Sequence, residues 1–134
     1  MKIIDGQGAI LGRLSSYVAK EALRGEEIIV VNCEKIIITG NKKNIKKEFE
    51  ENRNKRGRGL LGPKIHRTNE KIVKRAIRGM LPHYKKGRGE ECLRKIKCYS
   101  KIPEKFKTIE KLSIAKEKKN KFIEVKDLTK KWKK

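Results

Sequence analysis

Two short runs of β-branched residues near the amino terminus constrain the fold more than any other feature of the sequence. Ile28–Val31 and Ile36–Ile38 are continuous apolar segments, a pattern that suits strands in a sheet covered on both faces. Ahead of them, Lys2–Ile4 predicts a further strand, and Leu11–Leu23 has apolar residues at helical spacing with Gly25 as a stop signal. A strand, helix, strand order at this spacing predicts a right-handed βαβ unit and therefore an α/β fold.

The middle of the chain predicts two further helices separated by a basic loop. Asn41 is placed to cap a polar surface helix whose only strong apolar residues are Ile45 and Phe49. Thr68 is placed to cap the next helix, which has an apolar stripe and a basic side. The stripe comprises Ile72, Val73, Ala76, Ile77 and Met80, and the basic side comprises Lys71, Lys74, Arg75 and Arg78. Pro82 stops this helix because proline has no amide hydrogen to donate.

The last third of the chain predicts the end of a core and a basic extension. A short helix at Glu90–Lys95 and a strand at Ile96–Tyr99 complete the predicted core domain, residues 1–103. Residues 104–134 form a lysine-rich carboxyl-terminal extension, which we expect to pack on the core or on bound RNA. Two apolar signals occur in it, an extended segment with Phe122, Ile123 and Val125 and a helical pair of Leu128 and Trp132. Residues 104–121 have few apolar groups to offset the entropy of ordering them.

Charge is distributed unevenly along this chain of net charge +22. Residues 1–41 hold five Lys/Arg and five Asp/Glu, residues 42–100 hold twenty against six, and residues 101–134 hold thirteen against five. So basic a chain repels itself unless an anionic partner neutralises it, which makes nucleic acid the leading candidate. The neutral first third predicts a packed scaffold, and the basic remainder predicts a binding surface.

The sequence disfavours several classes of protein. No apolar run approaches the roughly 18 residues that span a bilayer, and "MKIIDGQG" lacks a signal peptide's apolar region, so we expect a cytosolic protein without membrane contact. Cys33, Cys92 and Cys98 include no C-x-x-C pair, which favours reduced thiols over a disulfide framework or a zinc ribbon. His66 and His83 show no metal-ligand spacing with these cysteines, and no nucleophile stands beside a histidine with an evident carboxylate. We therefore expect no metal, cofactor or catalytic centre.

One enzyme signal leaves an alternative open. Gly6, Gly8 and Gly12 form G-x-G-x-x-x-G between the first strand and helix, and Glu34 follows near the end of the next strand. This pattern resembles a dinucleotide-binding turn with one residue too many, so the alternative is a small Rossmann-like nucleotide-binding enzyme. The same glycines also suit a sharp turn and a close approach of helix to sheet. A third hypothesis, a DNA-binding chromatin protein, fits the charge but has no recognisable groove-reading helix.

Two basic clusters with interspersed glycines, Lys55–Arg67 and Lys85–Arg88, flank the predicted helix that follows Thr68. Glycine lets the backbone approach phosphates closely, and arginine binds phosphate oxygens through two parallel hydrogen bonds. Aromatic residues are few, which favours a binder of folded RNA over a protein that stacks on single strands. The predicted phosphate ligands are Arg53, Lys55, Arg56, Arg58, Lys64 and Arg67 from the first cluster, Lys85, Lys86 and Arg88 from the second, and Arg75, Arg78 and Arg94 beside them.

Four separated motifs point to one protein family. They are "IIDGQGAILGRLSSYVAK" from Ile3, "VNCEKIIITGN" from Val31, "RGMLPHYKKGRG" from Arg78 and "LRKIKCY" from Leu93. Together they resemble the ribosomal protein L-thirteen family of the large subunit, with similarity from Ile3 to Tyr99. The archaeal and eukaryotic branch is closer than the bacterial one, since "KIPEKF" stands where bacterial members carry a His-Pro-His segment.

The resemblance implies a three-layer α/β/α fold with a mainly parallel four-stranded sheet and no catalytic activity. It also implies a structural constituent of the cytoplasmic large ribosomal subunit, which binds and positions rRNA beside neighbouring ribosomal proteins and forms no homo-oligomer. In the family, the Gly-Met-Leu-Pro motif, here Gly79 to Pro82, and the basic turn after it lie in the RNA-facing region. Gly6, Gly8 and Gly12 become glycines that shape the fold on this interpretation.

Overall fold

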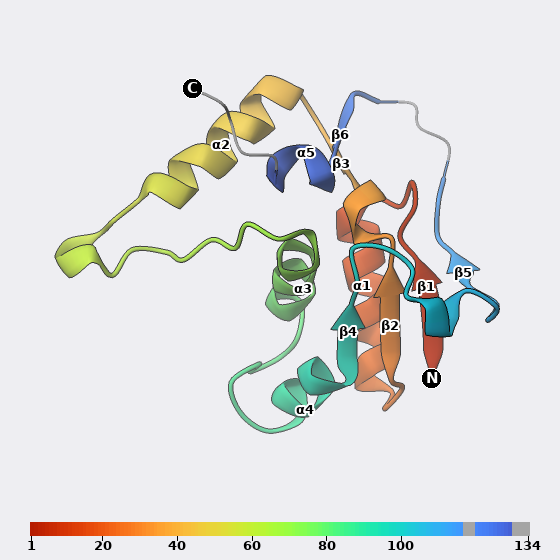
Figure 1. Ribbon diagram of the computed structural model, residues 1–134. Helices are drawn as coiled ribbons and strands as arrows, with labels where there is room; N and C mark the ends of the chain where they lie inside the picture. Colours follow the sequence, from red (N-terminus) through yellow and green to blue (C-terminus); the bar gives the residue numbers. More distant parts are fainter. Residues whose placement is uncertain (117–119, 130–134) are drawn as a thin grey trace.

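The chain is seen in a computed structural model that describes residues 1–116 and 120–129. Four strands form the main sheet in the order β4-β2-β1-β5, and each pairing between neighbours is parallel (Figure 1). These strands are β1 (Lys2–Asp5), β2 (Ile28–Val31), β4 (Ile96–Cys98) and β5 (Leu112–Ser113). The predicted α/β class with a mainly parallel four-stranded sheet is confirmed.

Helices cover one face of the sheet. They are α1 (Leu11–Leu23), α3 (Asn69–Gly79) and α4 (Arg88–Lys95), and both α3 and α4 pack against α1. Leu14 and Val18 of α1 and Ile77 of α3 are fully buried in a core that includes Ile4 and Val30 of the sheet. Burial of each such side chain stabilises the fold by about 1.5–3 kcal/mol. The apolar spacing in the sequence therefore identified the packed faces of these helices.

A thinner layer covers the opposite face of the sheet. Ile3, Ile29 and Val31 form a second apolar cluster there. Residues 99–106, which end in the 3₁₀ turn η3 (Glu104–Phe106), lie over this cluster through Tyr99, Ile102 and Phe106. All four residues of β2 are buried, as a continuous apolar strand covered on both faces requires.

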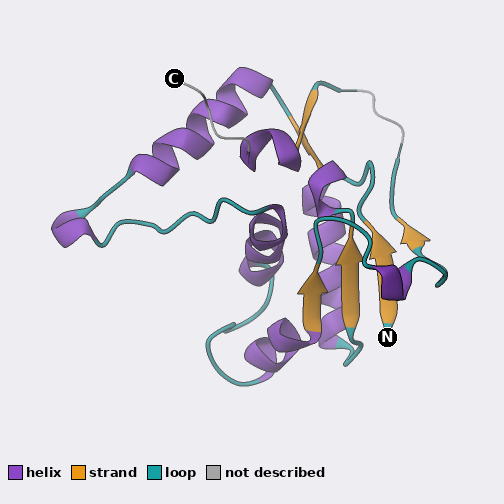
Figure 2. Cartoon of the chain, in the orientation of Figure 1, coloured by secondary structure: helices purple, strands orange, loops and turns teal. Residues whose placement is uncertain are grey.

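The second apolar run, Ile36–Ile38, does not enter the main sheet, contrary to the simplest expectation. Asn32 adopts the left-handed conformation (φ 56°), and Cys33–Lys35 form the 3₁₀ turn η1, which carries the chain across the end of the sheet. β3 (Ile37–Thr39) then pairs antiparallel with β6 (Phe122–Glu124). Figure 2 shows these two strands apart from the main sheet.

Other predictions of local structure are confirmed in part. The polar surface helix is α2 (Lys42–Asn54), which buries no residue and is capped by Asn41 Oδ1 accepting from Lys43 N at 3.0 Å. Thr68 precedes α3 but makes no side-chain capping bond, so that prediction is wrong. Met80 is 44% exposed because it follows the last turn of α3 instead of continuing its buried stripe.

The residues after 103 contribute to both sheets. β5 and β6 supply edge strands, and α5 (Val125–Thr129) packs against η1 and α3. Thr129 Oγ1 donates a hydrogen bond to Asn69 Oδ1 at 3.0 Å, which ties α5 to the start of α3. Val125 begins a helix, so its predicted extended conformation is wrong, and Trp132 lies outside the described residues. The division of the chain at residue 103 stays a prediction.

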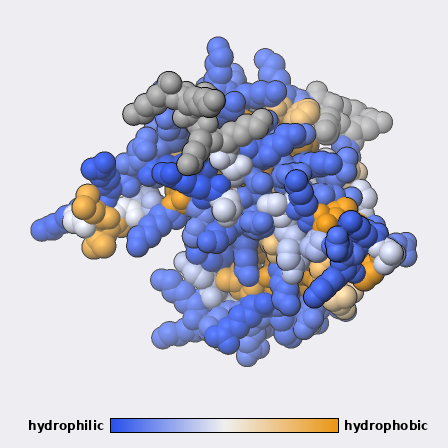
Figure 3. Space-filling model, viewed as in Figure 1, coloured by the Kyte–Doolittle hydropathy of each residue, from blue (hydrophilic) through white to orange (hydrophobic). Residues whose placement is uncertain are grey.

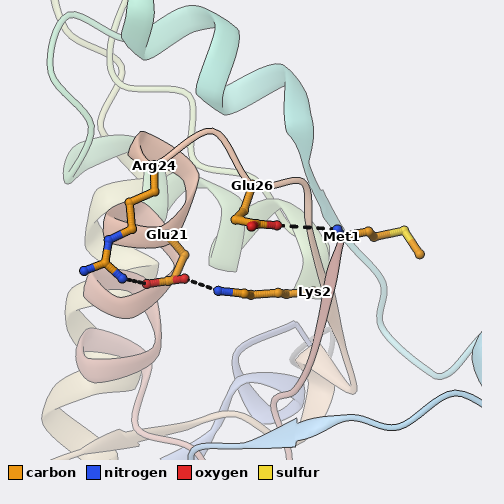
Figure 4. A network of polar contacts seen from close by, with 5 residues as sticks. All are labelled: Met1, Lys2, Glu21, Arg24 and Glu26. Carbon is orange, nitrogen blue, oxygen red and sulfur yellow. Dashed lines mark hydrogen bonds and ion pairs between the residues drawn. The ribbon is translucent and has the colours of Figure 1, made fainter.

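A polar network joins the first strand to the end of α1 (Figure 4). The buried carboxylate of Glu21 accepts hydrogen bonds from Lys2 Nζ and, at 2.7 Å, from Arg24 Nη1. Glu26 Oε2 lies 3.4 Å from the amino terminus at the surface. The hydrogen bond from Lys2, together with the charges of Lys2 and Arg24, holds the pKa of Glu21 below its ordinary value although burial opposes this.

We expect Glu21→Gln to lower the melting temperature at neutral pH and to reduce the protein's sensitivity to acid. Because the folded-state pKa of Glu21 is depressed, its contribution is present above the ordinary value of 4.5 and is lost as the pH falls through the folded value. Thermal melts of variant and wild type should therefore converge toward acid pH. Glu26→Gln, which removes the exposed pair with the amino terminus, should change the melting temperature less. Melting curves of Glu21→Gln that stay parallel to wild type at every pH would contradict this.

No helix in residues 1–116 and 120–129 is long and apolar enough to cross a membrane.

Candidate nucleic-acid interface

The first basic cluster lies on a projecting arm, which we define as residues 53–67 and call the basic arm. It runs from the last turn of α2 to the start of α3, and it extends away from the main sheet (Figure 1). Its two limbs touch at Gly62, whose amide donates to Arg56 O at 2.6 Å. A Cβ at Gly62 would overlap Lys55 O and lie 2.6 Å from Arg56 C. Glycine is therefore required for the arm to fold back on itself.

Most cations of the basic arm have no partner among the residues that the structure describes. Lys55, Arg56, Arg58, Lys64 and Arg67 are exposed. Lys55 Nζ donates to Asn52 Oδ1 at 3.0 Å, whereas the side chains of the other four make no hydrogen bond or ion pair with any described residue. Leu60 and Leu61, between these cations, are 74% and 83% exposed. The end of the arm thus presents free positive charge around a small apolar tip.

Arg53 is a half-buried cation at the root of the arm. Its guanidinium carbon lies 5.9 Å from the centroid of the Phe49 ring, and its Nε and Nη2 are buried without a hydrogen-bond partner among the described residues. Burial, and then the nearby charge of Arg67, lower the pKa of Arg53, while Glu50 acts in the opposite direction. Buried donors without partners beside a second cation are unfavourable, and an anion bound between Arg53 and Arg67 would satisfy both.

The second cluster lies on the basic turn, which we define as residues 82–88, between α3 and α4. Lys85 and Lys86 are exposed there, and their side chains make no hydrogen bond or ion pair with the described part of the chain. Together with Gly79, Leu81, His83 and Tyr84 they line a hollow of about 500 Å³. The helix end at Gly79 and the stop before Pro82 are as predicted, and they leave both lysines facing outward.

Four of the predicted phosphate ligands are held in place by contacts within the protein. These contacts run from Arg75 Nη1 to Lys64 O (3.0 Å), from Arg78 over the Tyr84 ring (4.7 Å to the centroid), from Arg88 Nη2 to Leu23 O, and from Arg94 Nη2 to Glu90 Oε1 (2.6 Å). The Arg75 contact ties the basic arm to α3. Each guanidinium has five N–H donors, so each keeps donors for a further ligand.

Helix α3 connects the arm and the turn through a basic face. Lys71, Lys74, Arg75 and Arg78 line a hollow of about 200 Å³ with His66 from the arm and Leu93 from α4. Hydrophilic residues predominate on the face of the molecule seen in Figure 3, apart from the apolar end of the basic arm. Lys71 and Lys74 were not among the predicted ligands, although their spacing from Arg75 and Arg78 places all four on one helix face.

The glycine turn after β1 is occupied by the chain's own residues. Gly6 N donates to Val31 O at 2.9 Å, and Gly8 N donates to Lys35 O at 3.2 Å. A Cβ at Gly6 would lie 2.7 Å from Ile36 Cγ1, so the segment after β2 covers the turn. Pyrophosphate binding requires backbone amides that are directed at the ligand. The amides of Gly6 and Gly8 are instead bonded to the chain's own carbonyl groups. Gly12 has open space around its Cβ position, so the expected structural need for glycine there is wrong.

A groove of about 570 Å³ between α2 and α3 is lined mainly by apolar side chains, among them Ile45, Phe49 and Ile72. None of the three glycines of the turn lines it. No group of three or more His, Cys, Asp or Glu side chains in the described ranges is arranged to hold a metal ion.

Comparison with known proteins identifies the family. Residues 1–105 match the family model described as Ribosomal protein L13. The chain belongs to this family. All of the predicted phosphate ligands lie within the L13 match, whereas β5, β6 and α5 lie beyond it.

Three similar L13 proteins come from archaea. Large ribosomal subunit protein uL13 of Methanocaldococcus jannaschii is 47% identical over 116 residues, which cover 84% of each chain. The uL13 of Methanosarcina barkeri is 45% identical over 116 residues, 86% of this chain and 81% of the relative. That of Methanococcus maripaludis is 49% identical over 107 residues, 78% and 77% of the two chains. The resemblance found in the sequence motifs, including its archaeal character, is confirmed.

Proposed function

We propose that this protein is a non-enzymatic structural constituent of the cytoplasmic large ribosomal subunit, where it binds and positions large-subunit rRNA. Membership of the L13 family and relatives named as large ribosomal subunit proteins support this location. The observation that carries RNA binding is the set of exposed cations without partners among the described residues, on two projections joined by the basic face of α3. These cations are Arg56, Arg58, Lys64, Arg67, Lys85 and Lys86.

The two kinds of cation have different roles in this proposal. The free cations of the basic arm and the basic turn neutralise phosphates and release condensed counterions, which favours binding. The anchored arginines, such as Arg75 and Arg78, fix the arm and the turn relative to α3. A phosphate between Arg53 and Arg67 supplies the anion that the buried guanidinium lacks. Neighbouring large-subunit proteins are further partners of this assembly.

Binding to isolated large-subunit rRNA should weaken steeply with salt. Six neutralised phosphates give a log-log slope on the order of −4 to −5, since each contributes roughly −0.7 to −0.9. Filter binding across a range of KCl concentrations measures this slope. Duplex DNA of equal length is the control, because a chromatin protein would bind both with similar affinity. A flat salt response, or equal affinity for the two nucleic acids, would overturn the proposal.

The nucleotide-binding alternative has its own test. Calorimetry with nicotinamide and adenine nucleotides should give no micromolar binding, since the turn amides at Gly6 and Gly8 are already bonded. Micromolar nucleotide binding that survives neutralisation of Arg56, Arg58, Lys85 and Arg88 would favour the Rossmann-like nucleotide-binding enzyme.

Co-sedimentation of the protein with large ribosomal subunits at moderate salt tests the proposed assembly directly.

A further inference from the structure

Two cysteines that are far apart in the sequence meet at the carboxyl ends of β2 and β4. Val30 of β2 is the register partner of Cys98 of β4. Beyond this pair, Tyr99 N donates to Val30 O at 2.8 Å, and Cys33 N donates to Tyr99 O at 3.1 Å. The turn η1 thus brings Cys33 back over the end of β4, and Cys98 packs against the buried cluster that contains Cys33. Both cysteines are free in the structure.

The two thiols have different surroundings. Cys33 is fully buried, with its Sγ 3.8 Å from Val30 O, whereas Cys98 is only half-buried. The neighbouring Cys33 thiol and then the charge of Lys74 lower the pKa of Cys98, while burial and Glu70 oppose this. The pKa of Cys33 is raised, first by the neighbouring Cys98 thiol and then by burial. Cys98 is therefore the thiol of the pair that loses its proton more readily, and Cys33 is the one that holds its proton more tightly.

We propose that Cys33 and Cys98 form a dithiol site that hydrogen peroxide oxidises to a disulfide. The Cys98 thiolate attacks one peroxide oxygen, the O–O bond breaks, and the products are a sulfenic acid on Cys98 and hydroxide, which takes a proton to become water. The Cys33 sulfur then attacks the Cys98 sulfur and displaces hydroxide, which leaves as water with the Cys33 proton. In total two thiols lose two electrons and two protons, and one peroxide becomes two waters.

The disulfide would act on stability by closing a long loop. The segment between Cys33 and Cys98 contains α2, the basic arm, α3, the basic turn and α4, and therefore all of the predicted phosphate ligands. A cross-link over so long a loop restricts the unfolded chain more than the folded one, whose strands β2 and β4 are already paired. The oxidised protein should accordingly melt at a higher temperature, by on the order of 10 °C.

Mass spectrometry of the full chain tests this site. After peroxide treatment and alkylation of remaining thiols, the intact mass should show the loss of two hydrogen atoms and one alkylated cysteine, and peptide mapping should join Cys33 to Cys98. Dithiothreitol should restore three alkylatable thiols. Cys92 is the matched control: it is buried elsewhere, with Sγ donating to Ala22 O at 3.3 Å, so Cys92→Ser should oxidise as wild type does.

Single substitutions test which cysteine reacts with peroxide and which one then forms the disulfide. Cys33→Ser should stop at a sulfenic acid on Cys98 that dimedone traps, and Cys98→Ser should slow the loss of free thiols by at least about tenfold. Folding of each variant is checked by circular dichroism, and mapping of the wild-type disulfide tests the site independently of them. A disulfide that includes Cys92, or folded wild-type protein that keeps three free thiols in peroxide, would overturn the proposal.

Discussion

Replacement of Gly89 by alanine should destabilise the protein by about 3 kcal/mol or more, or prevent it from folding. Gly89 is buried in the first turn of α4. A Cβ at this position would overlap Pro82 O and lie 2.9 Å from Pro82 C and 3.1 Å from His83 C. All of these atoms belong to the backbone, so no side-chain rotation relieves the overlap, and the basic turn itself would have to move.

Gly79→Ala is the matched control for this substitution. Gly79 is the last residue of α3, and an added Cβ there would meet no atom within 4 Å. Because alanine is a better helix former than glycine, this variant should be stabilised by roughly 0.5–1 kcal/mol. Chemical denaturation of both variants measures the free energy of unfolding. Similar values for the two would contradict the importance of the contact between Gly89 and Pro82.

The same contact links packing to the proposed binding surface. Gly89 sets how closely α4 approaches the basic turn, which carries Lys85 and Lys86. A shift of the turn would therefore displace both lysines relative to the basic face of α3. We expect any folded Gly89→Ala protein to bind rRNA more weakly although it keeps every charge.

The elements that could be predicted from the sequence are those with a local signal. α1 and β2 have the bounds that the apolar spacing indicates, because each buries its own continuous or periodic pattern. β5 carries no such signal: it has only two residues, both exposed, and is recognised by its pairing with β1. The run at Ile36–Ile38 suits any buried strand, and its antiparallel partner, β6, lies more than 80 residues further along the chain.

The features of the candidate site that could be predicted are likewise those with a local signal in the sequence. Glycine, lysine and arginine placed the basic arm and the basic turn correctly in loops, because these residues have local conformational and electrostatic effects. The internal partners were not predictable, since Arg88 reaches Leu23 across 65 residues of sequence and Arg75 reaches back to the arm. The closeness of Cys33 and Cys98 depends on the pairing of β2 with β4, so their spacing in the sequence gave no indication of it.

Neutralising the free cations of the basic arm should weaken rRNA binding on the order of 100-fold at moderate salt. The variant carries four substitutions, which are Arg56→Gln, Arg58→Gln, Lys64→Gln and Arg67→Gln. The log-log salt slope should fall by about 3, since each lost phosphate contact removes roughly 0.7 to 0.9. The melting temperature should change little, because these exposed side chains have no hydrogen bond or ion pair with the described residues.

A second variant with the same net charge shows whether the position of the four cations matters or only their total charge. Lys20, Lys101, Lys105 and Lys107 are exposed cations outside the arm and the turn, three of them in or beside the segment that covers the opposite face of the sheet. Their change to glutamine lowers the net charge by the same amount, so long-range attraction to RNA falls equally in both proteins. Direct phosphate contacts are lost only in the arm variant. If both variants lost the same affinity and the same salt slope, the arm would act through its charge alone, and its proposed contacts with rRNA would be wrong.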